Sequence, residues 1–248
     1  MAVHKVEVKR GVEPNKWKVT KYAEIGDEEF VKQMLELPTI LEAGMIEGKQ
    51  REDAKEALVS ILIDGLMPAF SELQQIRASV GQELPEMNRR QLYEDFARKL
   101  WKSYKDLMQK AVRSMGFDIG FLFEREKEFQ KGLRGFRTSN PLLRSVRKGY
   151  EEFLESNRKG WQNDLSQFRN TWVEHQQGDG RKFEKFYEPH SAELIFDCVW
   201  RTIADILPPL LEVHLPHGTR LVEQHPDDPG PRWPRRFRYQ LPAAYKLE

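Results

Sequence analysis

Apolar residues recur at steps of three and four along most of this chain, and this spacing constrains the fold more than any other feature of the sequence. Such spacing places apolar side chains on one face of an α-helix. It predicts long amphipathic helices over about 51–80, 88–116 and 140–177, which bury their apolar faces against one another. In the first stretch the apolar positions are Ala54, Leu58, Ile61, Leu62, Leu66, Phe70, Leu73 and Ile76.

Residues that favour helix ends divide these stretches. Asn88 is expected to open the second helix and Gly116 to end it. Asp118 is expected to cap a further helix that runs to about Leu133. Asn140-Pro141 is a strong start signal, because proline fits the first helical position. The helix that follows is expected to run for about 35 residues to Gln177 and to end at Gly178-Asp179-Gly180.

Prolines are expected to distort two of the helices. Pro68 lies inside the 51–80 stretch and predicts a kink there, because proline lacks a backbone N–H and its ring crowds the preceding turn. A last long helix is expected from Ser191 to about His214. Pro208-Pro209 should bend that helix or divide it.

The predicted fold class is therefore all-α, a multi-helix bundle with long antiparallel helices. Residues 1–25 alternate apolar and charged residues around a Gly-Val-Glu-Pro-Asn turn, which favours a small N-terminal β-hairpin. Residues 26–215 would form the helical bundle. Residues 216–248 would form a Pro/Arg-rich C-terminal extension that docks on the bundle.

Composition and motif content exclude several classes of function. Lys plus Arg (40) nearly balances Asp plus Glu (39), so the whole-chain charge favours neither nucleic acid nor membrane. No apolar run reaches the ~20 residues of a membrane span, and no signal peptide is evident, so a cytoplasmic protein is expected. The single cysteine, Cys198, excludes an internal disulfide and reads as a small buried hydrophobe.

Cofactor and metal sites are not expected either. The chain has no Gly-rich phosphate loop after a strand, no Gly-x-Ser-x-Gly and no His-Glu-x-x-His, so no cofactor is predicted. His190, His214, His217 and His225 match no compact ligand spacing, so no metal site is predicted.

One segment carries residues suited to chemistry: Arg169-Asn170-Thr171-Trp172-Val173-Glu174-His175, near the end of the long 140–177 helix. Arginine, then asparagine, then four residues and histidine at a helix end resembles the signature of the HEPN family. This resemblance covers about 140–215 and implies a helical bundle, commonly dimeric. It also implies a metal-independent ribonuclease of a toxin–antitoxin, abortive-infection or other defence system, with Arg169, Asn170 and His175 as the catalytic set.

The chemistry of these residue types fits such a reaction. RNA carries its own nucleophile, the 2′-hydroxyl, and an imidazole exchanges protons near neutral pH. An arginine can stabilise the charge that develops on the scissile phosphate. On a straight α-helix, however, Arg169 and His175 would lie about 120° apart around the axis and ~9 Å apart along it. A loosened last turn or a second subunit would be needed to bring them together.

A structural reading of the same residues stays open. Arg169 can pair with Glu174 or another acid, His175 can be a C-terminal helix cap, and Asn170 can simply be exposed, whereas Trp172 is expected to face the core in either case. The spacing alone is weak, since Arg220 and His225 in the tail repeat it. The alternative function is a non-catalytic helical scaffold or protein-interaction module. The partners considered are RNA, a second copy of the chain and a cognate partner protein.

The tail holds a second candidate contact with RNA. Its segment 232–239 interleaves basic and aromatic side chains, which together can hold single-stranded RNA through phosphates and stacked bases. The alternative is an edge strand whose aromatic residues dock on the bundle. The candidate RNA-binding residues are Arg232, Trp233, Arg235, Arg236 and Arg238.

Overall fold

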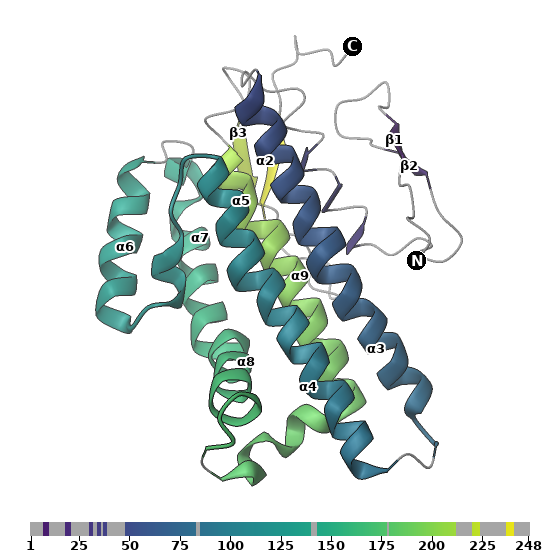
Figure 1. Cartoon of the computed structure of the whole chain (residues 1–248). Coiled ribbons are helices and arrows are strands. Elements are labelled where there is room, and N and C mark those ends of the chain that lie inside the picture. The colour runs from purple at the N-terminus through teal and green to yellow at the C-terminus, as the bar shows by residue number, and fades with distance from the viewer. Residues whose placement is uncertain are drawn as a thin grey trace.

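The computed structural model shows long helices packed side by side (Figure 1). It describes residues 48–82, 85–139, 143–177 and 179–211. It also describes residues 30, 31, 34, 35, 37 and 38, and four short strands. The described body is helical, in agreement with the predicted all-α bundle.

Two antiparallel helical stretches form the first layer. The first comprises α2 (Lys49–Ser60), the π-helical segment η1 (Ile61–Leu66) and α3 (Met67–Ser79). The second comprises α4 (Glu86–Lys102), the π-helical segment η2 (Ser103–Leu107) and α5 (Met108–Ser114). Helix α2 packs against α5 and α3 against α4, so the two stretches run in opposite directions (Figure 1).

The predicted ends of these stretches are confirmed, whereas the second stretch begins at Glu86, two residues before the expected Asn88. The first stretch ends within one residue of the expected position, and Gly116 adopts φ +88° just beyond α5, a left-handed conformation that favours glycine. The chain stays helical through Pro68. The π turn of η1 lies directly before that proline, where the ring would crowd the carbonyl of Asp64 in a regular α-helix.

The two π segments lie against each other where the stretches cross. Gly65 of η1 is buried there, and a Cβ atom added to it would come within 2.9 Å of both Ser103 Cβ and Leu107 Cδ1. The Ser103 hydroxyl donates to the carbonyl of Lys99 at 2.9 Å, which satisfies this fully buried group. Only glycine lets the two backbones approach this closely.

The second half of the bundle begins with a 3-10 turn where the sequence predicted the start of an α-helix. Asp118 does not cap an α-helix: its Oδ1 accepts from the N–H of Gly120 at 2.7 Å and starts the 3-10 turn η3 (Gly120–Phe123). A separate helix, α6 (Glu126–Ser139), follows. An aspartate can satisfy the first N–H groups of either kind of turn, so the residue type alone does not distinguish them.

The long helix predicted over 140–177 is present but interrupted. It comprises α7 (Leu143–Asn157), the π segment η4 (Arg158–Gln162), α8 (Asn163–Gln167) and the π segment η5 (Phe168–Val173). Gly160 leaves helical geometry, with φ −94° and ψ −121°. Glycine tolerates this conformation, so the helix changes course there instead of running straight. Asn140 and Pro141 lie outside the described residues.

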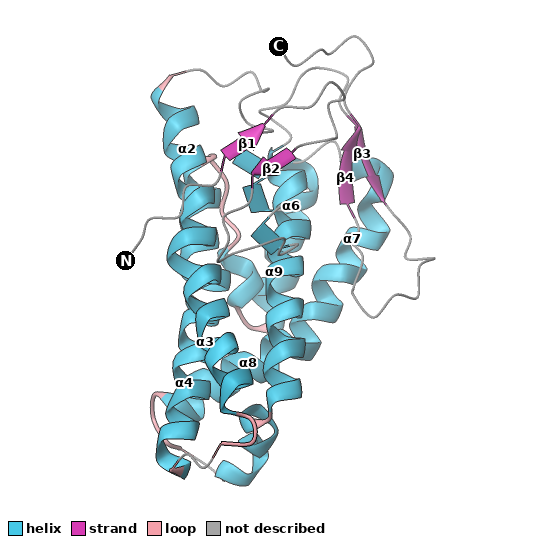
Figure 2. Cartoon of the chain, turned by 90° about the vertical axis from the view of Figure 1, so that its right-hand side faces the viewer, coloured by secondary structure: helices cyan, strands magenta, loops and turns pink. Residues whose placement is uncertain are grey.

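Helix α9 (Pro189–Leu211) runs through the middle of the bundle (Figures 1 and 2). It packs against α3, α4 and α5, and the 3-10 segment η6 (Gly180–Tyr187) leads into it. The expected break at Pro208-Pro209 does not divide the helix, which continues to Leu211. Its buried side chains join the single core: Ala192, Phe196, Val199, Trp200, Ile203, Ala204, Ile206 and Leu207.

The core also includes the described residues of the 30–38 region. The Phe30 ring lies 5.1 Å from that of Phe70 and 5.2 Å from that of Phe196, which are favourable separations for aromatic pairs. Cys198 of α9 is half-buried, less than expected, and burial raises the pKa of its thiol to about 11.

Four short strands complete the described chain. β1 (Glu7–Lys9) pairs antiparallel with β2 (Lys18–Thr20), and β3 (Arg220–Glu223) pairs antiparallel with β4 (Phe237–Gln240). β3 lies against α7 and β4 against α9 (Figure 2). Among the described residues, no helix combines the length and the hydropathy that crossing a bilayer demands.

Candidate functional site

The Arg169–His175 segment lies in a π turn. The N–H of Glu174 donates to the carbonyl of Arg169 at 3.0 Å, a bond that spans five residues where an α-helix spans four. This wider turn brings Glu174 over Arg169. The Arg169 Nε and Glu174 Oε1 atoms lie 3.4 Å apart, which makes them an ion pair. A regular α-helix would not place residues five apart on the same face.

The helix then ends in a left-handed cap. Gln176 has φ +50°, its N–H donates to the carbonyl of Trp172 at 2.8 Å, and the N–H of Gln177 donates to the carbonyl of Thr171 at 2.8 Å. Each of these bonds reaches one residue further back than in a Schellman motif, so the cap is widened like the π turn before it, and His175 directly precedes the left-handed residue. Gln176 therefore performs the role that the sequence suggested for a glycine, and Gly178 itself lies outside the described residues.

Arg169 and Asn170 are held together. Nη1 of Arg169 donates to Oδ1 of Asn170 at 2.8 Å, and Nδ2 of Asn170 donates to the Ser166 hydroxyl at 3.1 Å. The Arg169 Nε atom is buried and makes no hydrogen bond, because its N–H is poorly aligned with the Glu174 carboxylate despite their ion-pair distance. The Arg169 side chain is 36% exposed, so the rest of its guanidinium remains accessible.

Glu174 also forms an ion pair with a second arginine. Nε of Arg98, on α4, lies 3.5 Å from the same Oε1 atom, so one carboxylate lies between two guanidinium groups. Arg98 also donates to Asp95 at 2.8 Å. These contacts attach the end of η5 to α4 and partly neutralise the charge of Arg169.

His175 lies apart from this group. Its side chain is exposed and forms no hydrogen bond or ion pair with any described residue, Arg169 included. The structure thus brings Arg169 and Asn170 together and leaves His175 as a free imidazole at the helix end. Of the candidate RNA-binding residues, Arg232, Trp233, Arg235 and Arg236 lie outside the described residues, and Arg238 is described only as part of the backbone of β4.

Asn170 also lines a pocket that sequence reasoning did not identify. The pocket has a volume of about 380 Å³ and lies between η2, η3 and the face of the 143–173 helix that carries Asn170. Its charged lining consists of three cations, Lys105, Arg158 and Lys159, and one carboxylate, Glu124. The remaining lining is polar, aromatic or aliphatic: Trp101, Leu122, Phe123, Gln162, Asn163, Ser166 and Asn170.

The floor of this pocket is fixed by buried hydrogen bonds. The Tyr104 hydroxyl donates to Oε1 of Gln162 at 2.7 Å, and Nε2 of Gln162 donates to the carbonyl of Leu122 at 2.6 Å. Burial raises the pKa of Tyr104 far above its usual range, so this hydroxyl stays a neutral donor. The three elements that line the pocket are therefore joined at its base.

One sequence pattern, a run of polar residues at helical spacing, coincides with this pocket. Lys159, Asn163, Ser166 and Asn170 recur at steps of four, three and four, which places a polar stripe along one helix face. Lys105 comes from another helix and has no such signal.

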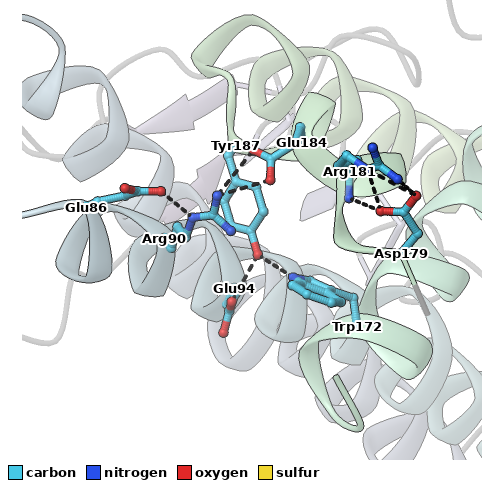
Figure 3. Close-up of polar contacts among 8 residues, drawn as sticks. All are labelled: Glu86, Arg90, Glu94, Trp172, Asp179, Arg181, Glu184 and Tyr187. Atoms are coloured by element: carbon cyan, nitrogen blue, oxygen red, sulfur yellow. Dashed lines mark hydrogen bonds and ion pairs between the residues drawn. The ribbon is translucent and has the colours of Figure 1, made fainter. Parts of the chain in front are cut away.

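A hydrogen-bonded network on the other side of η5 supports the motif helix (Figure 3). The indole N–H of Trp172 donates to the Tyr187 hydroxyl at 2.9 Å, and that hydroxyl donates to Glu94 at 3.0 Å. Arg90 lies 4.8 Å above the Tyr187 ring and pairs with Glu184 at 3.0 Å. Burial, together with the nearby Glu94 carboxylate, raises the pKa of Tyr187 to about 12.

Trp172 packs against the core, as predicted, and its ring stacks on that of Phe183 at 6.2 Å. A second pocket, of about 460 Å³, lies at the α3–α4 turn and contains none of the motif residues. Within the described part of the chain, no group of three or more His, Cys, Asp or Glu side chains could hold a metal ion.

Comparison with protein-family models, with curated proteins and with solved structures returned no significant match. The HEPN-like resemblance therefore depends on the residues of the motif and on their helical setting.

Proposed function

We propose that this protein is a HEPN-like, metal-independent endoribonuclease of the kind found in defence or toxin systems. In this proposal Arg169 and Asn170 bind the scissile phosphate and His175 transfers a proton. The tail residues Arg232, Trp233, Arg235, Arg236 and Arg238 are proposed as further RNA contacts.

The observation that carries the proposal is the double role of Asn170. It accepts the hydrogen bond of Arg169 at 2.8 Å and also lines a pocket with three cations and one carboxylate. A phosphate that meets the accessible part of the Arg169 guanidinium would therefore have a basic surface beside it for the next nucleotide. If the motif residues lay on an ordinary solvent-exposed helix face, no basic surface would lie beside them.

The reaction balances without a metal ion. The 2′-oxygen attacks phosphorus as its proton leaves, the bond between phosphorus and the 5′-oxygen breaks, and the 5′-oxygen takes up a proton. The products are a 2′,3′-cyclic phosphate and a 5′-hydroxyl. His175 is exposed and unpaired among the described residues. It would accept or donate one of these two protons, and water would transfer the other.

The separation of His175 from Arg169 makes a homodimer part of the proposal. Within one chain no described contact joins the two side chains. A second copy that packs against the end of η5 would place its own exposed His175 near the Arg169–Asn170 pair of the first. Sedimentation of the purified protein tests this part directly.

The matched comparison is between His175→Ala and His190→Ala. Both histidines are exposed and both lie at helix ends, so neither substitution should alter the circular dichroism spectrum or the melting temperature. The proposal expects His175→Ala to lose at least about a hundredfold in cleavage rate and His190→Ala to keep the wild-type rate. Equal rates in the two variants would remove His175 from the mechanism.

A second candidate function is a non-catalytic helical scaffold or protein-interaction module that binds a cognate partner protein. The observation that favours it is Glu174, which partly neutralises Arg169 and would repel a phosphate. This candidate expects no cleavage by the wild-type protein and no functional effect of substitutions at Arg169 or His175.

A further inference from the structure

The pocket beside Asn170 contains hydrogen-bond donors that have no acceptor among the described residues. Arg158 already has partners, since its guanidinium donates to Glu126 Oε2 at 2.5 Å and to the carbonyl of Glu124 at 2.8 Å. Lys159 pairs with Glu155 at 3.5 Å. Lys105 differs from both, because its half-buried ammonium forms no ion pair with any described residue and only lies 5.9 Å from the Phe123 ring centre.

Trp101 supplies the second unpaired donor. It lines the same pocket and is 5% exposed, yet its indole N–H donates no hydrogen bond to any described residue. An indole N–H can only donate, and Trp101 Nε1 is not among the buried side-chain atoms that lack a partner, so this N–H reaches solvent in the pocket. The N–H is therefore available to an acceptor that enters the pocket.

Two polar side chains of the motif helix extend this set. Asn163 accepts from Gln167 through Oδ1, which leaves its amide N–H groups free. Ser166 accepts from Asn170, which leaves its O–H free to donate. Against these donors the pocket offers one exposed carboxylate, Glu124. Donors in excess of acceptors, with an unpaired ammonium among them, favour an anion that carries several acceptor oxygens.

We propose that this pocket binds a phosphate of the RNA strand that flanks the scissile one, with Lys105 as its cation and Trp101 as a neutral donor. This inference rests on the proposed function, since it assumes that RNA lies across Asn170. The volume of about 380 Å³ suits a nucleotide unit better than a lone ion. The pocket thus sets where the strand enters, and Arg169 and Asn170 bind the next phosphate.

The test compares Lys105→Gln with Lys110→Gln in the full-length protein. Lys110 lies on α5, is exposed and does not line the pocket, so it controls for the loss of one positive charge. The probe is a short 2′-O-methyl RNA, which cannot be cleaved because its nucleophile is blocked. Its affinity is measured by fluorescence anisotropy over a series of salt concentrations.

The proposal expects Lys105→Gln to weaken binding by roughly three- to tenfold and to reduce the slope of log affinity against log salt by about one. Lys110→Gln should stay within about twofold of wild type. If the wild type binds and the two variants behave alike, the pocket inference is overturned while the proposed function stands. If the wild type binds no RNA, the proposed function itself fails.

An independent readout follows the Trp101 N–H. The indole signal that disappears in Trp101→Phe identifies this group in a proton–nitrogen correlation spectrum of the wild type. That signal should shift when the 2′-O-methyl RNA is added, because its N–H gains an acceptor. A signal that stays in place while RNA binds would exclude Trp101 from the site.

Discussion

Replacing Gly65 by alanine tests how the helices that frame the pocket are held together. Gly65 lies where the π segments η1 and η2 cross, and η2 also carries Lys105. An added Cβ would lie within 2.9 Å of Ser103 Cβ and Leu107 Cδ1, which is closer than van der Waals contact allows. The helices would have to separate, and overpacking of this kind costs about 1–3 kcal/mol.

The matched control is Gly135→Ala. A Cβ at Gly135, on α6, meets nothing within 4 Å, so this substitution should only add helix propensity, about 0.8–1.0 kcal/mol. Because both variants receive a similar propensity gain, the difference between their unfolding free energies isolates the contact, expected at about 1–3 kcal/mol. Urea unfolding followed by circular dichroism measures both, and each 1 kcal/mol corresponds to about 2–4 °C in melting temperature.

A second substitution makes this prediction more specific. Ser103→Gly in the Gly65→Ala protein removes the Cβ and Oγ atoms that crowd the new methyl group. The double variant should therefore be more stable than the sum of the two single effects predicts. If Gly65→Ala is as stable as Gly135→Ala, or if the two effects simply add, the close approach of the helices is refuted.

Three further predictions concern the candidate site. Gln176→Gly should stabilise the protein by about 0.5–1 kcal/mol, since φ +50° costs a glutamine more than a glycine; chemical unfolding checks this, and a loss of stability would contradict the cap. Tyr187 should ionise near pH 12 instead of 10, which tyrosinate absorbance of wild type and Tyr187→Phe can measure. Because the folded state favours the protonated phenol, the stability that this group contributes is complete below pH 10 and is lost as the pH rises towards 12. Glu174→Gln should tighten RNA binding by roughly two- to fivefold, because it releases Arg169 from an ion pair that exposed examples place at about 0.5–1 kcal/mol; unchanged or weaker affinity would show that Glu174 does not restrain Arg169.

Most of the helical fold could be predicted, because amphipathic spacing reports burial directly. The first stretch was expected over 51–80 and is found over 49–79. The π segments could not be predicted, since a hydrogen bond to the fifth residue leaves no mark in composition. The break at Gly160 was missed for a related reason: a single glycine in a helical pattern is usually tolerated.

The candidate site was predictable only in part. The proximity of Arg169 and Asn170 follows from their adjacency, but the position of Glu174 over Arg169 depends on the π turn of η5. The pocket could not be found from local spacing, because Lys105 and Arg158 lie on helices that only the tertiary fold brings together. Long-range packing, not motif, creates that site.

The proposed function requires that this chain cleave RNA through the RNA's own 2′-hydroxyl and without a metal ion. The most direct measurement incubates the purified protein with a 5′-labelled RNA in excess EDTA and identifies the new ends. We expect cleavage that leaves a 2′,3′-cyclic phosphate and a 5′-hydroxyl, and no cleavage at a site with a single 2′-deoxy substitution. Intact RNA, or products with 5′-phosphates and 3′-hydroxyls, would contradict it.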